Sequence, residues 1–151
     1  MEFNGFMDLP PLVDGEISLV CTAKNNAILE KNWVPAYVFD ICVNREIVGL
    51  INLRIGHNEI IRYAGHIGYF VNEEHWGKGY APRAVKLLVP VLAFHKMDKV
   101  LITNSLANIA SQRVCEKIGA KLIATETTPK WHDTYAEGWR TTNIYEWEVV
   151  K

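Results

Sequence analysis

The most restrictive feature of the sequence is the segment at residues 65–81, GHIGYFVNEEHWGKGYA. A strand pattern runs there into a glycine-bearing loop, and the loop opens directly into a helix pattern. Gly65 and Gly68 leave the strand without side chains, which is typical of a place where another backbone or a ligand comes close. The order strand, loop, helix favours an α/β arrangement over an all-helical or all-strand fold.

The loop has the features of an anion site. Backbone N–H groups in the first turn of a helix have no partner within the helix, and the helix dipole adds partial positive charge. Gly77 and Gly79 allow an anion to approach the backbone, and Lys78 adds a charge at the rim. The P-loop pattern is absent, and Pro82 stands where the dinucleotide-binding pattern requires its third glycine.

The first half of the chain predicts an antiparallel meander. Residues 16–22 and 36–43 have strand patterns, and residues 24–31 favour a short helix or turn. Residues 44–46 form a tight turn that connects the second strand to a third at 47–55, so a hairpin is the simplest pairing. A polar loop is expected at residues 56–63, before the glycine-bearing strand at 65–71.

The second half alternates helices and strands. Residues 79–96 predict a helix with Pro82 in its first turn and a kink at Pro90. Asn108 and Gly119 mark the two ends of a second helix. The expected strands lie at residues 99–103, 121–125 and 142–149, and a long loop lies at 126–138. Together the patterns predict one α/β (α+β) domain over residues 1–151, with a mixed, mainly antiparallel sheet.

Composition narrows the class of protein. The chain has 151 residues and a net charge of -1, so it lacks the basic excess of a nucleic-acid-binding domain. No apolar window approaches the roughly 18 residues of a membrane span, and the acidic start does not read as a secretory signal. Its 3 cysteines lie at no metal-ligand spacing, so no metal is expected. These observations predict a reduced, cytoplasmic protein that binds neither nucleic acid nor membrane.

Two motifs resemble the GNAT superfamily of acetyl-CoA-dependent acetyltransferases. Residues 76–81, WGKGYA, are similar to its loop Gln/Arg-x-x-Gly-x-Gly/Ala, with Trp76 in place of Gln or Arg. Residues 108–120 resemble its helix Asn-x-x-Ser-x-x-x-x-Glu-Lys-x-Gly. The resemblance extends over residues 16–149 and implies a sheet of about six to seven strands, splayed at its centre and flanked by helices.

The resemblance also implies where acetyl-CoA binds. The pantetheine arm would lie between the strands at 65–71 and 99–103, along the backbone of Tyr69, Phe70 and Val71. Asn108 would contact the cofactor, or it would serve only as a helix cap. The pyrophosphate would lie on the loop residues Trp76, Gly77, Lys78, Gly79, Tyr80 and Ala81.

The resemblance also implies which residues are catalytic. Cys115 stands where many relatives have the tyrosine that protonates the departing thiolate, although its place on the apolar helix face also suits a packed core residue. The N–H of Phe70 or Val71 would bind the thioester carbonyl. His66 is the predicted general base, because its pKa lies near working pH and relatives carry a glutamate nearby. Other candidates for the base are Glu73, Glu74, His57 and Glu59.

The resemblance predicts an N-acetyltransferase that moves the acetyl group of acetyl-CoA directly to an amine acceptor. A catalytically weak acyl-CoA-binding module is the alternative, because Thr103 replaces an acidic position and Cys115 replaces the acid. The aromatic-rich final strand could pair across a homodimer. The candidates for acceptor binding are aromatic and come from the hairpin and the late loop: Tyr37, Phe39, Tyr63, Trp131 and Tyr135. Aromatic residues at strand spacing also suit the core, so only Trp131 and Tyr135 are expected to be exposed loop residues.

Overall fold

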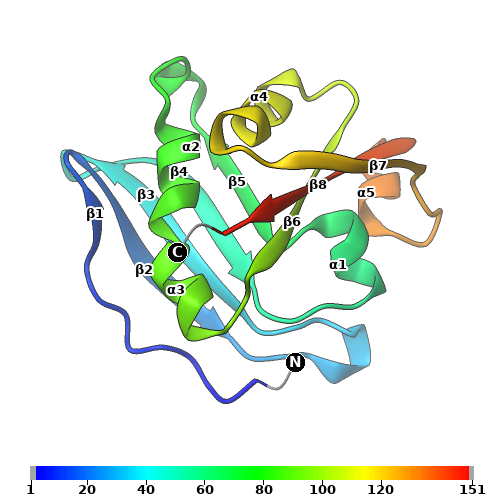
Figure 1. Ribbon diagram of the computed structural model, residues 1–151, viewed down its shortest axis with the longest axis horizontal. Coiled ribbons are helices and arrows are strands. Elements are labelled where there is room, and N and C mark those ends of the chain that lie inside the picture. Colours follow the sequence, from blue (N-terminus) through cyan, green and yellow to red (C-terminus); the bar gives the residue numbers. More distant parts are fainter. Residues whose placement is uncertain (1–2, 150–151) are drawn as a thin grey trace.

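Two antiparallel sheets form the framework of the protein (Figure 1). The computed structural model describes residues 3–149. The strands are β1 (Leu12–Asp14), β2 (Ile17–Asn25), β3 (Ala36–Val43), β4 (Glu46–Arg54), β5 (Ile67–Val71), β6 (Lys99–Ser105), β7 (Lys121–Thr127) and β8 (Thr141–Glu148). The α-helices are α1 (Glu59–Ala64), α2 (Tyr80–Leu87), α3 (Val89–Phe94), α4 (Ile109–Ile118) and α5 (Asp133–Ala136), with 3-10 turns η1 (Leu29–Lys31) and η2 (Glu73–His75).

The larger sheet has the order β1-β2-β3-β4-β5. Alternate residues of β3 point into the core, so Tyr37, Phe39 and Ile41 are fully buried, as their spacing predicts. The predicted hairpin is confirmed, since β3 and β4 pair antiparallel around a turn at Asn44 and Arg45. Both turn residues have positive φ, 50° and 71°, which matches the twist that a two-residue hairpin needs.

The smaller sheet has the order β6-β8-β7 and is also antiparallel. It meets the larger sheet where β5 and β6 begin side by side. No ladder between β5 and β6 is found within residues 3–149, so the parallel contact expected of a mixed sheet is replaced by a split. The predicted fold class, a mainly antiparallel sheet splayed at its centre, is confirmed, with eight strands in the described chain.

Helices α2 and α3 cover one face of the larger sheet (Figure 1). The sequence predicts one kinked helix over residues 79–96, and the structure divides it at Leu88 into two helices. Pro90 causes the division because it has no N–H to donate and lies in the first turn of α3. Pro82 lies within the first turn of α2, where its missing donor costs little.

Three elements differ from the sequence prediction. Strand β1 was not expected. Helix α1 replaces the polar loop predicted at residues 56–63, and it begins where the Asn58 side chain accepts a hydrogen bond from the Ile61 N–H (3.0 Å). Helix α5 lies within the predicted long loop. Each of these elements is six residues or shorter, too short to show a clear hydrophobic period.

The split between the sheets depends on a glycine at its closed end. Gly65 has φ 79°, and a Cβ there would lie 3.0 Å from the Leu101 carbonyl oxygen and 3.1 Å from the Thr103 nitrogen. Gly119 has a similar φ of 82°, but its Cβ would meet nothing within 4 Å. Gly65 has ψ 162°, a backbone conformation that is essentially restricted to glycine, whereas Gly119 has ψ 21°, in the left-handed helical region. Gly65 is therefore constrained by its conformation and by the approach of another strand, and Gly119 only by its positive φ.

We expect Gly65→Ala to destabilise the fold far more than Gly119→Ala. Gly119→Ala carries only the cost of a left-handed conformation, about 1–2 kcal/mol. Gly65→Ala places a side chain in a conformation that is nearly restricted to glycine and also pushes β6 away from the start of β5. Urea unfolding of the two variants measures the difference. Equal losses of unfolding free energy would show that neither the conformation of Gly65 nor the close approach of β6 contributes.

Candidate active site

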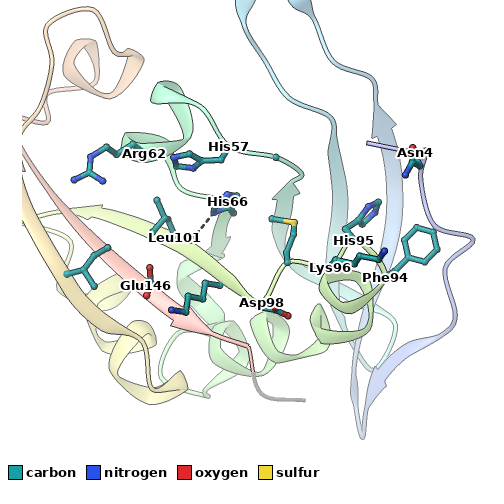
Figure 2. A pocket seen from close by; sticks show the side chains of 15 residues that line it. Asn4, His57, Arg62, His66, Phe94, His95, Lys96, Asp98, Leu101 and Glu146 are labelled. Carbon is teal, nitrogen blue, oxygen red and sulfur yellow. Dashed lines mark hydrogen bonds between the residues drawn. The ribbon is translucent and has the colours of Figure 1, made fainter. Parts of the chain in front are cut away.

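His66 joins the two sheets at the closed end of the split. Its backbone N–H donates to the Leu101 carbonyl (2.7 Å), and its ring Nδ1 accepts from the Leu101 N–H (2.8 Å; Figure 2). Its own carbonyl accepts from the Arg54 N–H of β4 (2.7 Å). One residue thus satisfies both backbone groups of Leu101 and ties β6 to the larger sheet.

The His66 ring is buried, with only 5% of the residue exposed. Burial, with a smaller contribution from His57, lowers its pKa to about 4, so the ring is neutral at physiological pH. The ring lines a cavity of about 890 Å³ together with His57, Arg62 and Leu101 (Figure 2). This cavity is not the one that contains Tyr69. The catalytic role of His66 stays a prediction, and its hydrogen bonds give it a structural role.

Beyond this junction, one edge of β5 is open. Backbone groups alternate in direction along a strand, and the Asn72 N–H bonds to Val48 of β4 while the His66 carbonyl bonds to Arg54. Phe70 follows the same alternation: its carbonyl would lie 2.2 Å from a Cβ on Gly49 of β4. The backbone groups of Tyr69 and Val71 therefore face the split, whereas those of Phe70 face β4.

Trp76 occupies part of that open edge. Its indole Nε1 donates to the Val71 carbonyl (2.6 Å), while 63% of the residue is exposed. Trp76, which replaces the usual Gln or Arg, thus occupies one hydrogen-bond acceptor of the β5 edge. The Tyr69 backbone and the Val71 N–H remain on the open side.

The glycine loop ends at an uncapped helix N-terminus. Gly79 is the N-cap of α2 with φ 76°, and no side chain caps the helix. Gly77 has φ 78°, and a Cβ on either glycine would meet nothing within 4 Å. The first turn of α2 therefore has no side-chain cap, and the loop glycines before it border open space, which is the arrangement expected of a phosphate site. Lys78 is exposed beside them.

A buried polar network lies between β5 and α4. The Tyr69 hydroxyl is 3.0 Å from Ser111 Oγ, which also accepts a hydrogen bond from Asn104 Nδ2 (3.3 Å). Asn104 Oδ1 accepts in turn from Asn143 Nδ2 of β8 (3.2 Å). Burial raises the pKa of Tyr69 well above its usual range, so its hydroxyl stays protonated. Sequence reasoning missed Ser111 as a functional candidate, although it lies in the Asn-x-x-Ser motif.

Cys115 lies beneath this network and is fully buried. Burial raises its pKa to about 12, and Asn104 Nδ2 lies 3.9 Å from its sulfur. The thiol therefore stays protonated, and it does not line the cavity described next. Its catalytic role stays a prediction, and its surroundings are those of a core residue.

A cavity of about 880 Å³ opens on the split. It brings together Tyr69, Asn108 and Ser111 from the cofactor side with residues 32–34, which follow η1, and α5 from the other. Asn108 also caps α4, because its Oδ1 accepts from the Ser111 N–H (3.1 Å). The capping role is therefore present, and contact with a cofactor stays a prediction.

The aromatic residues of this cavity are not those that the sequence favours. The prediction that Tyr37 and Phe39 bind the acceptor is wrong, because both are fully buried in the core. Trp131 is 56% exposed but packs on Tyr63 outside the cavity lining. Tyr135 stacks under Arg140. Besides Tyr69 and His132, the aromatic residues that line the cavity are Trp33 and Trp139.

The remaining base candidates lie apart from this cavity. Glu59, Glu73 and Glu74 are exposed. Thr103, which replaces the usual acidic residue, donates its hydroxyl hydrogen to the Tyr63 carbonyl (2.8 Å). Residues 3–149 contain no group of three His, Cys, Asp or Glu side chains that could hold a metal ion. None of the helices in this part of the chain is long and apolar enough to cross a membrane.

The comparison with known families gives one match. The model of the acetyltransferase (GNAT) domain matches residues 16–121. These residues include the glycine loop, both sides of the split and helix α4. No curated protein sequence matches the chain.

Solved structures share the fold at low sequence identity. The microcin C7 self-immunity acetyltransferase MccE, solved with acetyl-CoA and AMP, has 20% identity and a TM-score of 0.60 over 76% of this chain and 61% of its own. RimL, a ribosomal L7/L12 α-N-protein acetyltransferase solved with coenzyme A, has 20% identity and a TM-score of 0.60 over 80% and 64%.

A third structure, the ribosomal-protein-S5-alanine acetyltransferase from Vibrio fischeri, has 19% identity and a TM-score of 0.60 over 76% of this chain and 62% of its own. The chain therefore spans less than two thirds of each of these three proteins. At this identity the likeness shows the fold.

We expect the stability of the protein to fall between pH 6.5 and pH 4 because of His66. The unfolded chain binds a proton near pH 6.5, whereas the folded ring resists protonation until about pH 4. The loss is about 3 kcal/mol across this window. His66→Asn removes that titration and keeps an oxygen that can accept from the Leu101 N–H, so it should cost less than His66→Ala at pH 7.

Urea unfolding of both variants at pH 7 and pH 5 measures these effects. Other acidic and histidine groups titrate in all three proteins, so the relevant quantity is the difference in pH dependence from wild type. If His66→Asn loses as much stability with acid as wild type, the neutral buried ring is not the cause.

Proposed function

Since the chain belongs to the GNAT acetyltransferase family, we propose that it transfers the acetyl group of acetyl-CoA to an amine acceptor. The observation that carries the proposal is the uncapped N-terminus of α2, which faces open space beside the free edge of β5. Acetyl-CoA supplies an activated thioester to such a site. The acceptor is proposed to reach that thioester from the cavity lined by Trp33 and α5.

The chain offers a complete set of contacts for the cofactor. N–H groups of residues 77–81 would hold the pyrophosphate, and Lys78 would add charge at its rim. The backbones of Tyr69 and Val71 would pair with the pantetheine arm as an added strand pairs with a sheet edge. Asn108 lines the same cavity from α4. The N–H of Val71, one of the two donors that the sequence suggests, faces the split and would bind the thioester carbonyl.

The Ser111 hydroxyl is proposed to donate a hydrogen bond to the departing thiolate, while the Tyr69 hydroxyl supports Ser111. Asn104 already occupies one lone pair of Ser111 Oγ, and the Tyr69 O–H can donate to the same oxygen. In that arrangement the Ser111 hydrogen is free to point into the cavity. Loss of one hydrogen-bond donor aimed at developing negative charge costs typically about 10²–10³-fold in kcat.

The ammonium proton of the acceptor needs a different route. His66 lines the other cavity and uses its Nδ1 lone pair on Leu101, so its action as the base would require that bond to break. We propose that the proton passes to water at the cavity mouth, where the exposed carboxylates of Asp133 and Glu137 lie. His66 as the base, a cytoplasmic location and a homodimer stay predictions.

One observation favours the second candidate function, an acyl-CoA-binding module with weak catalysis. The usual acidic and tyrosine positions hold Thr103, whose hydroxyl is used on Tyr63, and Cys115, whose pKa is about 12. The two functions differ in thiol release. Both require acetyl-CoA to bind.

We expect Gly79→Asp to abolish acetyl-CoA binding. The added carboxylate would stand at the N-terminus of α2 and repel the pyrophosphate, while a Cβ there meets no neighbour. The measurement is the rise in melting temperature with acetyl-CoA. Gly138→Asp is the matched control, because Gly138 also has positive φ (103°) and open space but lies beside α5. An unchanged thermal shift in Gly79→Asp would overturn the assignment of the loop.

We expect Ser111→Ala to lower kcat for acetyl transfer at least tenfold, with little change in the KM for acetyl-CoA. Cys115→Ala should change kcat by less than about twofold, since the thiol does not line the cavity. Release of coenzyme A thiol with a panel of amines measures both variants. The reverse order, with Cys115→Ala the slower enzyme, would instead support the thiol as the acid.

A further inference from the structure

The side chain of Arg54 lines the cavity assigned to the acceptor. It extends from the last residue of β4, and its Nη1 donates to the carbonyls of Gly65 (2.9 Å) and Ala64 (3.4 Å). Burial desolvates the guanidinium and lowers its pKa. It is therefore a partly buried cation that faces an open cavity.

Arg54 has no carboxylate partner among residues 3–149. Two other arginines pair with acids: Arg62 with Glu126, and Arg83 with Asp14 and Glu16. The remaining three, Arg45, Arg113 and Arg140, are exposed to solvent. A guanidinium has five N–H donors, and the two hydrogen bonds of Arg54 use Nη1 alone. Because a buried charge without a partner is costly, the remaining donors of this side chain suit an anion from outside the chain.

Asn52 adds neutral donors beside this cation. It lies two residues before Arg54 on the same face of β4 and lines the same cavity. Its Oδ1 accepts from the Gly68 N–H (3.1 Å), which fixes the amide and leaves the Nδ2 hydrogens for another partner. An arginine fork and an amide on one face are well suited to a carboxylate.

The position of Arg54 separates this anion from the phosphates of the cofactor. Its backbone N–H bonds to His66 at the start of β5, whereas the glycine loop follows the other end of that strand. Five strand residues, about 3.3 Å each, lie between the two ends. A pantetheine arm running along β5 from the loop would place the thioester before Arg54, so Arg54 lies on the acceptor side.

Charges on the opposite wall complete the match. Asp133 and Glu137 of the α5 region line the cavity one helical turn apart, and no ion-pair partner for either is found within residues 3–149. They would attract an ammonium group, as Arg54 would attract an anion. Trp33 and Trp139 form apolar walls. A cavity of about 880 Å³ is of the size that small molecules occupy.

From these contacts we infer that the acceptor is a small amine that also carries a carboxylate, as an amino acid does, and that Arg54 and Asn52 bind this carboxylate. The inference rests on the proposed acetyl transfer and adds the class of acceptor. The amine end would face the thioester between β5 and α4, and the carboxylate would lie at the closed end of the split.

A purely structural role for Arg54 is the competing explanation. The side chain donates to two carbonyls at the end of α1, as a basic residue at a helix C-terminus commonly does. Loss of that contact would lower stability and would affect every acceptor equally. The preference for an acid over its uncharged amide distinguishes the two roles, because only carboxylate binding changes it.

The experiment measures coenzyme A thiol release with the twenty L-amino acids, their α-carboxamides and O-phosphoethanolamine. For the preferred acceptor we expect a KM at least tenfold lower for the acid than for the carboxamide. Arg54→Gln should remove this preference, and Arg54→Lys should keep part of it. Arg62→Gln is the matched control, since it removes an arginine of α1 that lies outside this cavity and should leave the preference intact.

The outcomes separate this inference from the proposed function. Equal use of acids and carboxamides, or an unchanged preference in Arg54→Gln, would overturn the carboxylate site while acetyl transfer stands. Preference for O-phosphoethanolamine over every amino acid would replace the carboxylate with a phosphate. Absence of thiol release from all amines, with no thermal shift by acetyl-CoA, would contradict the proposed function itself.

Discussion

The fold depends on one contact, the pairing of His66 with both backbone groups of Leu101. A strand normally satisfies its neighbour through a ladder of many hydrogen bonds, but here β5 and β6 are held together only at their start. The neutral imidazole acts as a backbone acceptor at the point where the ladder stops. Because the tie is local, the strands can diverge beyond it without leaving the Leu101 N–H unpaired in the interior.

That divergence creates the site. The backbones of Tyr69 and Val71 face an open edge, and an unpaired edge is a template for another extended chain. The Tyr69 side chain crosses to Ser111 of α4 and bridges the split through a polar network rather than apolar packing. The same separation of strands thus provides a place for a cofactor arm and positions two hydroxyls beside it.

The sequence predicted the fold where local patterns were strong and missed it where contacts come from distant residues. The alternation in β3, the cap at Asn108 and the proline break in α2–α3 each follow from short-range physics, and each is confirmed. The backbone direction of Phe70 depends on which strand lies beside it, which no local pattern contains. Arg54 and Ser111 gain their significance only from the cavity into which the fold places them.

The near-zero net charge of the chain is compatible with a cofactor that is held by backbone N–H groups. A cofactor with several negative charges would seem to require a basic protein, yet the helix N-terminus at Gly79 presents N–H groups that do not enter a charge count. Side-chain charges are then available to bind the proposed acceptor. There the protein retains a guanidinium with no carboxylate partner among residues 3–149, Arg54, in partly buried surroundings that lower its pKa. A partly buried charge is unfavourable until a ligand supplies the opposite charge. Arg54 would therefore discriminate between charged and uncharged acceptors more strongly than a solvated surface charge would.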